Sequence, residues 1–435
     1  MNCEAKPNLR QLARRPLIQA LSSWALWIAC TAAATAEFSA KPYIQGGALY
    51  DTNPYFQTSG QNPEAAWGTI FDVRLPLKLQ TPRASISLAP RLLYSFYPDE
   101  KFEGAELRDK YLTGGANWNS RQSNLGASYG YTNLSLRTSE FDSSGGSGTT
   151  RFSRDDTQRR WYFQPYWQYQ LSPVNAFNLN GGYDEVRYDE KFVRRRFNYD
   201  YTFASAGLTH TFNPRHSISL RARFAKFDAE NMNLRITNDS ETNSLSLIYN
   251  YAWSDTTQLL ADLGWARTKN TVIRPNNIDP ITGPYCEPAF IAFLPCEFKS
   301  DSANFVGNLS ATKRSETTNY TIAIGQSVTP NSNGAEVLRF RINASASKTF
   351  SERINGLLSI AAFTQDDVGS STRDFEQDGI NARLRLNYRL AQHWSLYGAY
   401  VYTFRKTTQA LFEDRTIRNH ALSFGVTYQG DGWRW

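Results

Sequence analysis

Polar and apolar residues alternate along some eighteen segments of this chain, and the stretches that join these segments are by turns short and long. In the segment 67–79, Trp67 and Phe71 stand at one parity, and Asp72 and Arg74 stand at the other. A period of two is that of a β-strand whose two faces meet different environments. The pattern predicts an all-β fold, a single transmembrane, antiparallel, up-and-down β-barrel.

The connections predict how this barrel lies in its membrane. Each connection from an even to an odd strand is expected to be a short turn, such as 81–83 and 119–121, and each connection from an odd to an even strand is expected to be longer and polar. An even strand number with both termini on the short-turn side is the arrangement of bacterial outer-membrane barrels, with short periplasmic turns and long extracellular loops. We expect about eighteen strands, and a count of about sixteen stays open because the first and fifteenth segments have the weakest alternation.

The apolar parity of each strand is expected to face lipid, and in the eighth strand this parity carries Tyr199, Tyr201 and Phe203. Because only every second residue of such a barrel meets lipid, a mean hydropathy of −0.52 is compatible with a membrane protein. The 24 Tyr, 26 Phe and 11 Trp fit the aromatic girdles at the two membrane interfaces. A large soluble β-sandwich or propeller is the alternative.

Residues 1–36 are predicted to be a cleaved signal peptide, and residues 37–435 the barrel. A basic start is followed by the apolar stretch 17–34 and by the small residues Ala34-Thr35-Ala36, which suit a signal peptidase. The net charge of +7 for the whole chain is modest and does not indicate nucleic-acid binding.

The two cysteines beyond the signal, Cys286 and Cys296, fall in the longest predicted loop, at about 270–299. An isolated pair in an exported chain predicts a disulfide, which would contribute on the order of 3 kcal/mol. Half of a metal site is the alternative, but no His or further Cys is close in sequence.

The parity opposite to the lipid face is expected to line a lumen that the side chains of so many strands do not fill. Asp72, Asp184 and Asp262 are its sparse acids. Two interpretations stay open: a lumen that favours anionic solutes or an anionic polymer, or a network of Arg and Asp that stabilises the wall. An open lumen and a lumen constricted by a loop both stay open, and the candidates for an inward-folded loop are the Cys286–Cys296 loop and the Gly/Ser-rich loop 139–156. The predicted lumen-lining residues, candidate contacts for an anion or a polysaccharide, are Arg74, Lys78, Arg91, Tyr162, Gln164, Tyr166, Gln168, Arg221, Arg223, Arg339, Arg341, Arg383, Arg385 and Arg389.

The sequence predicts neither an enzyme nor a cofactor or metal site. None of the four histidines stands beside a convincing nucleophile, and no Gly-rich phosphate loop or zinc-spaced cluster is present.

Three features together resemble a known family: the segment Tyr50-Asp51-Thr52-Asn53, the tyrosine-rich strands, and the last strand at 422–428. The family is that of outer-membrane β-barrel porins associated with exopolysaccharide export and biosynthesis systems. The resemblance implies a channel in the outer membrane of a Gram-negative bacterium that is linked to capsule or exopolysaccharide biosynthesis. Together with the strand rhythm and the basic lumen, it predicts a channel that assists exopolysaccharide export. The expected partners are the outer-membrane lipid, the barrel assembly machinery, and anionic polysaccharide with polysaccharide-export components.

One departure from the family concerns the C-terminus, because Tyr428 is followed by the segment 429–435. Either the last strand continues to Trp435 through a bulge at the glycines, or it ends at Tyr428 and a short tail follows. Two alternative functions remain: a general or anion-preferring diffusion porin, and a structural or adhesion barrel whose extracellular loops bind a ligand.

Overall fold

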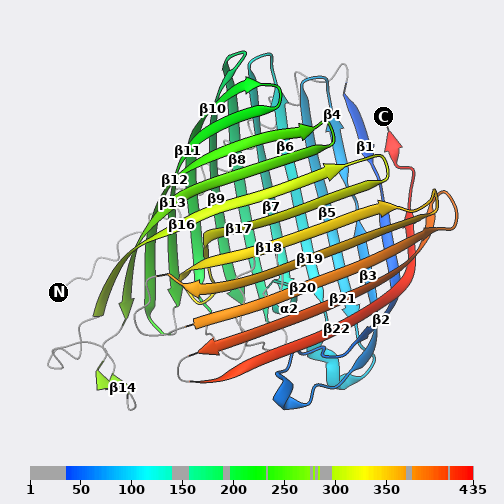
Figure 1. Cartoon of the computed structure of the whole chain (residues 1–435). Coiled ribbons are helices and arrows are strands. Elements are labelled where there is room, and N and C mark those ends of the chain that lie inside the picture. The colour runs from blue at the N-terminus through cyan, green and yellow to red at the C-terminus, as the bar shows by residue number, and fades with distance from the viewer. Residues whose placement is uncertain are drawn as a thin grey trace, which may run out of the picture.

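The computed structural model describes residues 36–139, 156–189, 196–231, 234–274, 278–279, 283–284, 296–368, 375–409 and 412–434. Within them, eighteen wall strands form a closed antiparallel β-barrel (Figure 1). Each strand pairs with the next, and β22 pairs with β2, which closes the ring. The strands are β2 (Tyr43–Asp51), β3 (Ala66–Arg74) continued by β4 (Leu77–Gln80), β5 (Ala84–Phe96), β6 (Arg108–Asn119), β7 (Ser123–Ser135), β8 (Thr157–Ser172), β9 (Asn175–Asp189), β10 (Asn198–Asn213), β11 (His216–Asn231), β12 (Ile236–Ser254), β13 (Thr257–Arg274), β16 (Cys296–Arg314), β17 (Thr318–Pro330), β18 (Glu336–Thr349), β19 (Ile354–Asp367), β20 (Phe375–Arg389), β21 (Trp394–Gln409) and β22 (Phe412–Gln429).

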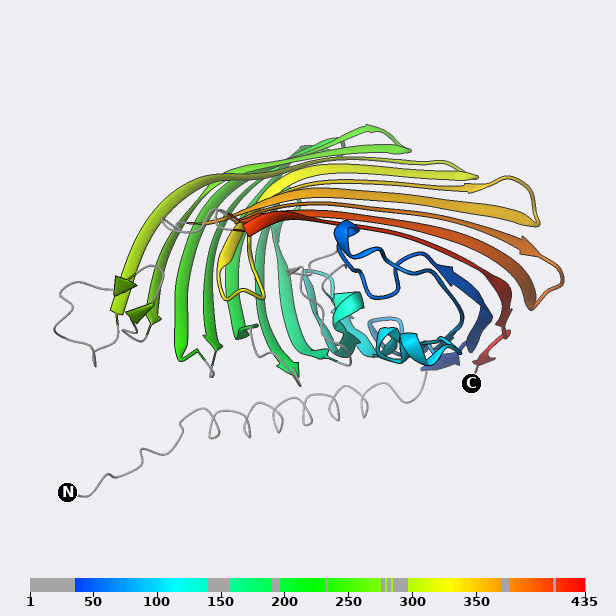
Figure 2. The same ribbon diagram turned by 90° about the horizontal axis from the view of Figure 1, so that it is seen from below.

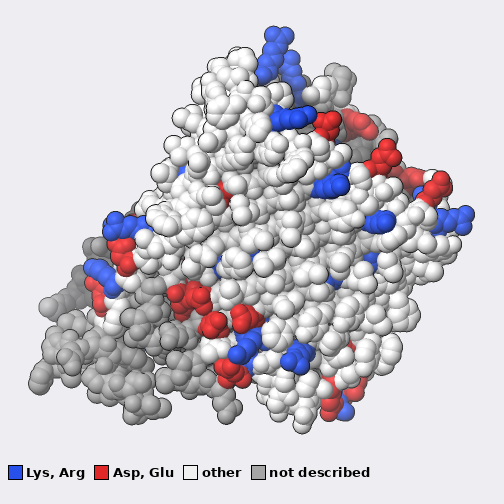
Figure 3. Space-filling model, in the orientation of Figure 1, with Lys and Arg blue, Asp and Glu red and all other residues white. Residues whose placement is uncertain are grey.

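The outer face of the barrel is apolar. On β3, Trp67 is 62% and Phe71 48% exposed, whereas Asp72 on the opposite face is 3% exposed. Figure 3 shows charged side chains gathered mainly towards the two edges of this surface, with a broad and largely uncharged band between them. A soluble protein does not expose so much apolar surface, and a closed barrel satisfies every wall hydrogen bond without water. Other exposed apolar residues of this face are Leu92, Leu208, Leu220, Leu245, Leu263, Leu309, Ile322, Leu384 and Phe424.

Aromatic residues mark the border of this band on the side of the long connections. The rings of Trp265 on β13 and Phe305 on β16 meet edge to face at 5.4 Å. Arg267, two residues beyond Trp265 on β13, forms an ion pair at 2.6 Å with Asp301, four residues from Phe305 towards the same end of β16. A change from aromatic to charged side chains is typical of a membrane interface. The parts of β13 and β16 beyond these residues therefore lie outside the bilayer.

The predicted second strand, 67–79, is interrupted. Pro76 has no N–H to donate, and the chain changes partner there, so that β4 pairs with β1 (Glu37–Ala40) instead of β2. β1 in turn pairs with β23 (Trp433–Arg434), which follows a break at Gly432 with φ +82°. The C-terminal segment is thus a continuation of the wall beyond the glycines rather than a loose tail.

The prediction for the eighth strand, β10, assigned the wrong face. Leu208 is 57% exposed on the outer face, and Tyr199, at the opposite parity, is 9% exposed and faces the lumen. Tyr199 packs on Phe227 of β11 with ring centroids 5.4 Å apart. The aromatic residues at this end of β10 belong to an apolar cluster inside the barrel, formed by β9, β10 and β11. The alternation alone does not distinguish a strand face that packs in such a cluster from one that faces lipid.

The rule of long connections from odd to even strands is also wrong at two places. Only residues 232–235 join β11 to β12, and only 410–411 join β21 to β22. The longest connection is shorter than predicted, because β13 continues to Arg274 and β16 begins at Cys296. Between them, β14 (Ile278–Asp279) pairs with β15 (Gly283–Pro284).

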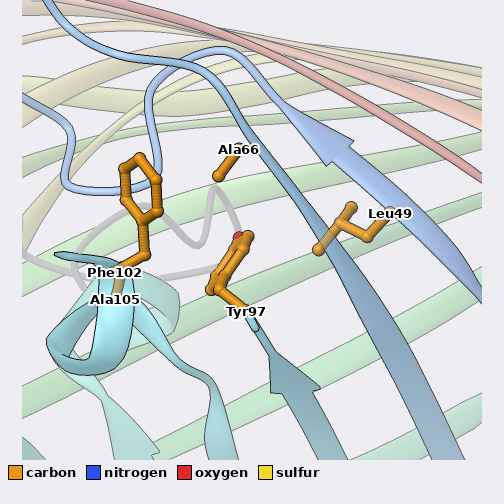
Figure 4. Packing of buried hydrophobic residues seen from close by; sticks show 5 residues of the cluster. All are labelled: Leu49, Ala66, Tyr97, Phe102 and Ala105. Carbon is orange, nitrogen blue, oxygen red and sulfur yellow. The ribbon is translucent and has the colours of Figure 1, made fainter. Parts of the chain in front are cut away.

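Three short helices fold into the mouth of the barrel at the end with the long connections (Figure 2). They are η1 (Ser59–Gln61), η2 (Glu100–Ala105) and α2 (Leu136–Ser139). Leu49 and Ala66 of the wall form a small apolar core with Tyr97, Phe102 and Ala105 (Figure 4). Among the described residues, no helix is long and apolar enough to cross a membrane.

Arg137 of α2 fastens this group to the wall. It forms a buried ion pair with Asp51 at the end of β2. Arg137 also donates to the hydroxyl of Tyr97 at 2.9 Å, and that hydroxyl donates to Asp51 at 3.2 Å. Burial raises the pKa of Tyr97 to about 12. Burial by itself would lower the pKa of Arg137, but the charge and hydrogen-bond interactions with Asp51 and Tyr97 together outweigh burial and hold this pKa above its ordinary value.

Candidate channel lumen

Asp72 organises the first group of predicted lumen residues. Its carboxylate accepts from Arg74 Nε at 3.0 Å and from Arg91 Nε at 2.8 Å, across the β3–β5 ladder. The guanidinium of Arg74 lies 5.0 Å from the ring centroid of Tyr43, and that of Arg91 lies 4.9 Å from the centroid of Tyr111. Two positive charges thus share one negative charge, and aromatic rings hold both guanidinium groups against the wall.

Two further ion pairs follow the same arrangement on the wall from β8 to β13. Arg221 of β11 pairs with Asp262 of β13. Arg160 of β8 donates to Asp184 of β9 at 2.8 Å, and its guanidinium lies 5.3 Å from the ring centroid of Tyr162. Sequence reasoning missed Arg160, although its even parity matches that of Tyr162 and Gln164 on the same strand. On this part of the wall the arginines are largely neutralised by aspartates.

The inward face of β20 and β21 has a different charge balance. Arg383, Arg385 and Arg389 point to the same side of β20, opposite to Leu384 and Leu386, which are 43% and 48% exposed on the lipid face. Within the described parts of β20 and β21, no inward position carries Asp or Glu. We call the inward positions of these two strands the basic face.

Arg385 has neutral hydrogen-bond partners on this basic face. It donates to Gln45 Oε1 at 2.8 Å and to Asn387 Oδ1 at 2.8 Å. Its guanidinium lies 4.8 Å from the ring centroid of Tyr397. Arg223, on the other wall, is held in a similar way by the hydroxyl of Tyr201 at 3.1 Å. These contacts fix the orientation of the side chain without cancelling its charge.

A buried ladder of polar side chains crosses from β18 to β21 near the mouth. Arg339 Nε donates to Gln365 at 2.9 Å, Gln365 donates to Gln377 at 2.8 Å, and Gln377 donates to Thr407 at 3.1 Å. Gln365 and Gln377 are fully buried. Arg339 is therefore part of the internal structure, whereas Arg341 lies one inward position nearer the middle of β18 and is half-buried.

The predicted residues of β8 line the wall as a flat surface. The rings of Tyr162 and Tyr166 lie over Gly130 and Gly126 of β7, where a Cβ would come within 2.5 Å of each ring. Gln164, between them, is half-buried. The two glycines allow the rings to lie along the wall instead of projecting into the lumen. Two other predicted residues, Lys78 and Gln168, are exposed at inward positions nearer the short turns.

β16 and β17 separate at the level of Trp265 and Phe305, the aromatic residues at the border of the apolar band. The β16–β17 ladder ends at Gly307 and Gln326, whereas β16 continues beside β13 beyond this point. The side-chain amide of Gln326 donates to the carbonyl oxygen of Phe305 at 2.9 Å, where the next ladder bond would fall. The ends of β17 and β18 and their connection bend into the lumen as the inner hairpin, residues 327–339 (Figure 2).

The tip of the inner hairpin is bound to the wall of β10 and β12. The backbone N–H of Phe197 donates to the carbonyl of Ser332 at 2.9 Å, and the side chain of Asn238 donates to the carbonyl of Gly334. Gly334 has φ +78°, and a Cβ there would lie 2.4 Å from the ring of Phe197. The approach is so close that only glycine fits.

A buried carboxylate completes this attachment. Glu336 accepts hydrogen bonds from Ser240 at 2.5 Å and from Thr242 at 2.9 Å, both on β12. The sequence pointed to two other loops as candidates for an inward fold and did not identify this hairpin. The loop 140–155 and Cys286 lie outside the described residues, and so does the predicted signal peptide up to residue 35.

The cysteine pair and a metal site were the remaining sequence hypotheses. Cys296 is 4% exposed at the start of β16 and is disulfide-bonded. Its pairing with Cys286 stays a prediction, because Cys286 is outside the described residues. In the described part of the chain, no group of three or more His, Cys, Asp or Glu is arranged to hold a metal ion.

The closed ring, its apolar outer band and its polar interior define the class of this protein: it is a β-barrel of the bacterial outer membrane with the fold of a porin-like channel. No protein-family model and no curated protein matches the chain. The resemblance to porins of exopolysaccharide export therefore stays a prediction.

Solved structures with a similar fold are outer-membrane channels and receptors. OpdQ of Pseudomonas aeruginosa is 10% identical with a TM-score of 0.42, and the alignment covers 90% of this chain and 97% of that one. OccAB2 of Acinetobacter baumannii is 10% identical with a TM-score of 0.43, covering 92% and 98%. The ferric-catecholate import receptor Fiu of E. coli is 8% identical with a TM-score of 0.46, covering 90% and 81%. The assignment of the fold rests on the closed hydrogen-bonded ring rather than on these likenesses.

Proposed function

We propose that the barrel is a diffusion channel that prefers small anionic solutes. The observation that carries the proposal is the charge balance of the basic face, where Arg383, Arg385 and Arg389 of β20 face the lumen with no inward acid on β20 or β21. On the opposite wall, aspartates neutralise most arginines. The lumen therefore has a path along β20 and β21 on which an anion is attracted and a cation is repelled.

The expected preference is modest. At about 10 Å from one arginine, a monovalent anion in water is stabilised by roughly 0.4 kcal/mol, and screening at 0.1 M salt reduces this to about 0.15 kcal/mol. Three arginines together then contribute about 0.5 kcal/mol, which is roughly a two-fold difference in permeability. A water-filled channel with this preference discriminates by charge without binding its solute tightly.

Reversal potentials of the purified protein in planar bilayers, measured across a KCl gradient, test this proposal. The wild type should favour chloride, and the triple variant R383Q/R385Q/R389Q should lose the roughly two-fold contribution of these three charges. The matched variant R383K/R385K/R389K keeps the three charges and should behave as the wild type does. A cation preference in the wild type, or an unchanged preference in the Gln variant, would refute the proposal.

Assistance in exopolysaccharide export is the second candidate, as the sequence resemblance implies. The observation that favours it is the set of stacked pairs on the lumenal wall, among them Arg91 with Tyr111 and Arg385 with Tyr397. Aromatic faces and arginines suit acidic sugars, and they would guide an anionic polymer as well as a small anion. Deletion of the gene followed by measurement of released polysaccharide separates the two, since unchanged polymer would eliminate export and leave the diffusion channel.

A further inference from the structure

An apolar groove of about 310 Å³ crosses the lipid-facing side of the wall, on β16 to β19. Along β18, Ala344 and Ala346 form its floor. Their neighbours in the ladder are large: Ala344 lies between Ile322 and Ile360 in one row, and Ala346 lies between Tyr320 and Leu358 in the next row. Small residues between larger ones leave a slot that runs along the strand.

Two lysines stand at the end of this groove that is nearer the periplasm. Lys313 of β16 belongs to the groove lining, in the row of Tyr320. Lys348 is the next outward residue of β18 after Ala346 and lies 5.4 Å above the ring of Phe350. Both lysines are exposed, and the ion pairs of the described chain join neither of them to an acid. Glu316 and Glu352 lie in the adjacent short turns; Arg314 ends β16 beside the first turn, and Arg353 lies in the second.

We propose that this groove is a binding site for one anionic phospholipid of the periplasmic leaflet. An acyl chain lies over Ala344 and Ala346, and the phosphate is held between Lys313 and Lys348. The position of the lysines beside the short turns corresponds to the depth of the headgroups in that leaflet. Between lipid and protein no hydrophobic driving force exists within the bilayer, so close packing in the slot and the two charges provide the preference over bulk lipid.

A second copy of the barrel is the other occupant to be considered, because small residues allow close approach of two membrane surfaces. A symmetric contact through this face would place the lysines of one copy against those of the other. Like charges brought together in this way oppose the contact, whereas a lipid phosphate neutralises both lysines. The charge of the groove therefore favours the lipid.

Native mass spectrometry of the purified protein in mild detergent tests the site, with phosphatidylglycerol and phosphatidylethanolamine as probes. The wild type should retain one phosphatidylglycerol in preference to phosphatidylethanolamine. A344F fills the slot and should reduce the retention of either lipid about ten-fold or more. K313Q/K348Q should still retain lipid but lose the preference, by about five-fold for each lysine.

A matched control places the same large side chain elsewhere on the lipid face. Ala206 is an outward, exposed residue of β10 on the far wall, and A206F should retain lipid as the wild type does. Heat-dependent mobility in gels verifies that each variant is a folded barrel. Equal retention by A344F and wild type, equal affinity of the wild type for both lipids, or a dimer that disappears in A344F would overturn the proposal.

Discussion

Detachment of the inner hairpin is expected to widen the extracellular mouth of the barrel. Gly334 holds the tip in a left-handed conformation and against the ring of Phe197. The variant G334V introduces a β-branched residue at φ +78° and a Cβ at 2.4 Å from that ring, so both the backbone and the packing oppose the docked position. The strand pair β17–β18 below the tip is not altered, and the wall in the bilayer should remain intact.

The size of the effect follows from the free energies that favour and oppose the docked position of the hairpin. A left-handed valine costs roughly 1–2 kcal/mol, and the overlap with the ring costs about 1–3 kcal/mol more. The docked tip is held by two ordinary hydrogen bonds of about 1 kcal/mol each and by the two bonds to the Glu336 carboxylate, of roughly 1.5–3 kcal/mol each. A detached hairpin regains ladder bonds with β16, so the net docking free energy is smaller than the sum of these contacts.

G334V should therefore populate the open mouth, and G334V/E336A should populate it further, because the second change also removes the carboxylate that Ser240 and Thr242 bind. Single-channel conductance in planar bilayers should increase from wild type to the single and then to the double variant. Uptake of larger solutes into proteoliposomes should increase in the same order.

Gly432 provides a matched control, since it also has a positive φ, of +82°, and a Cβ there would lie 2.6 Å from the carbonyl oxygen of Ala40. G432V introduces comparable strain at the periplasmic end and should leave the conductance unchanged. A folded G334V/E336A barrel with wild-type conductance would refute the role of the inner hairpin, and so would an equal increase in G432V.

Three further predictions concern charges and burial in the lumen and the mouth. D72N should increase the anion preference in reversal-potential measurements, because two arginines lose their shared carboxylate; an unchanged preference would show that their charges do not reach the permeation path. R137A should reduce the local stability of the mouth by about 3–5 kcal/mol, because Asp51 remains buried without its cation. Limited proteolysis should then cleave the variant at residues 97–105, where the wild type resists. The pKa of Tyr97 in the folded protein is raised to about 12, so its contribution to stability is complete below about pH 10 and is lost as the pH rises to 12. In chemical unfolding over this pH range, the wild type should lose this part of its stability and Y97F should not.

The outer face was predictable from sequence because lipid imposes one requirement on every wall strand. Trp67, Leu220 and Phe424 are far apart in the chain, yet each is exposed on the outer side, as the alternation predicts. The closure of the ring also follows, since an open edge within the bilayer would leave backbone groups without partners. The periodicity therefore predicted the architecture, and it identified the inward parity on which most of the candidate residues lie.

The positions of the inward-facing residues were less predictable, because some of these residues meet water in the lumen and others pack against apolar side chains. On β10, Tyr199 alternates as a lipid-facing residue would, but it packs inside against Phe227, and period alone does not distinguish the two. Which charges cancel depends on register: Asp72 reaches Arg91 only because β5 pairs beside β3. The same argument explains why the basic face was hidden among fourteen similar candidates in the sequence. An arginine counts toward selectivity only where the neighbouring strands bring no aspartate to it, and that is a property of strand order and stagger rather than of any one segment.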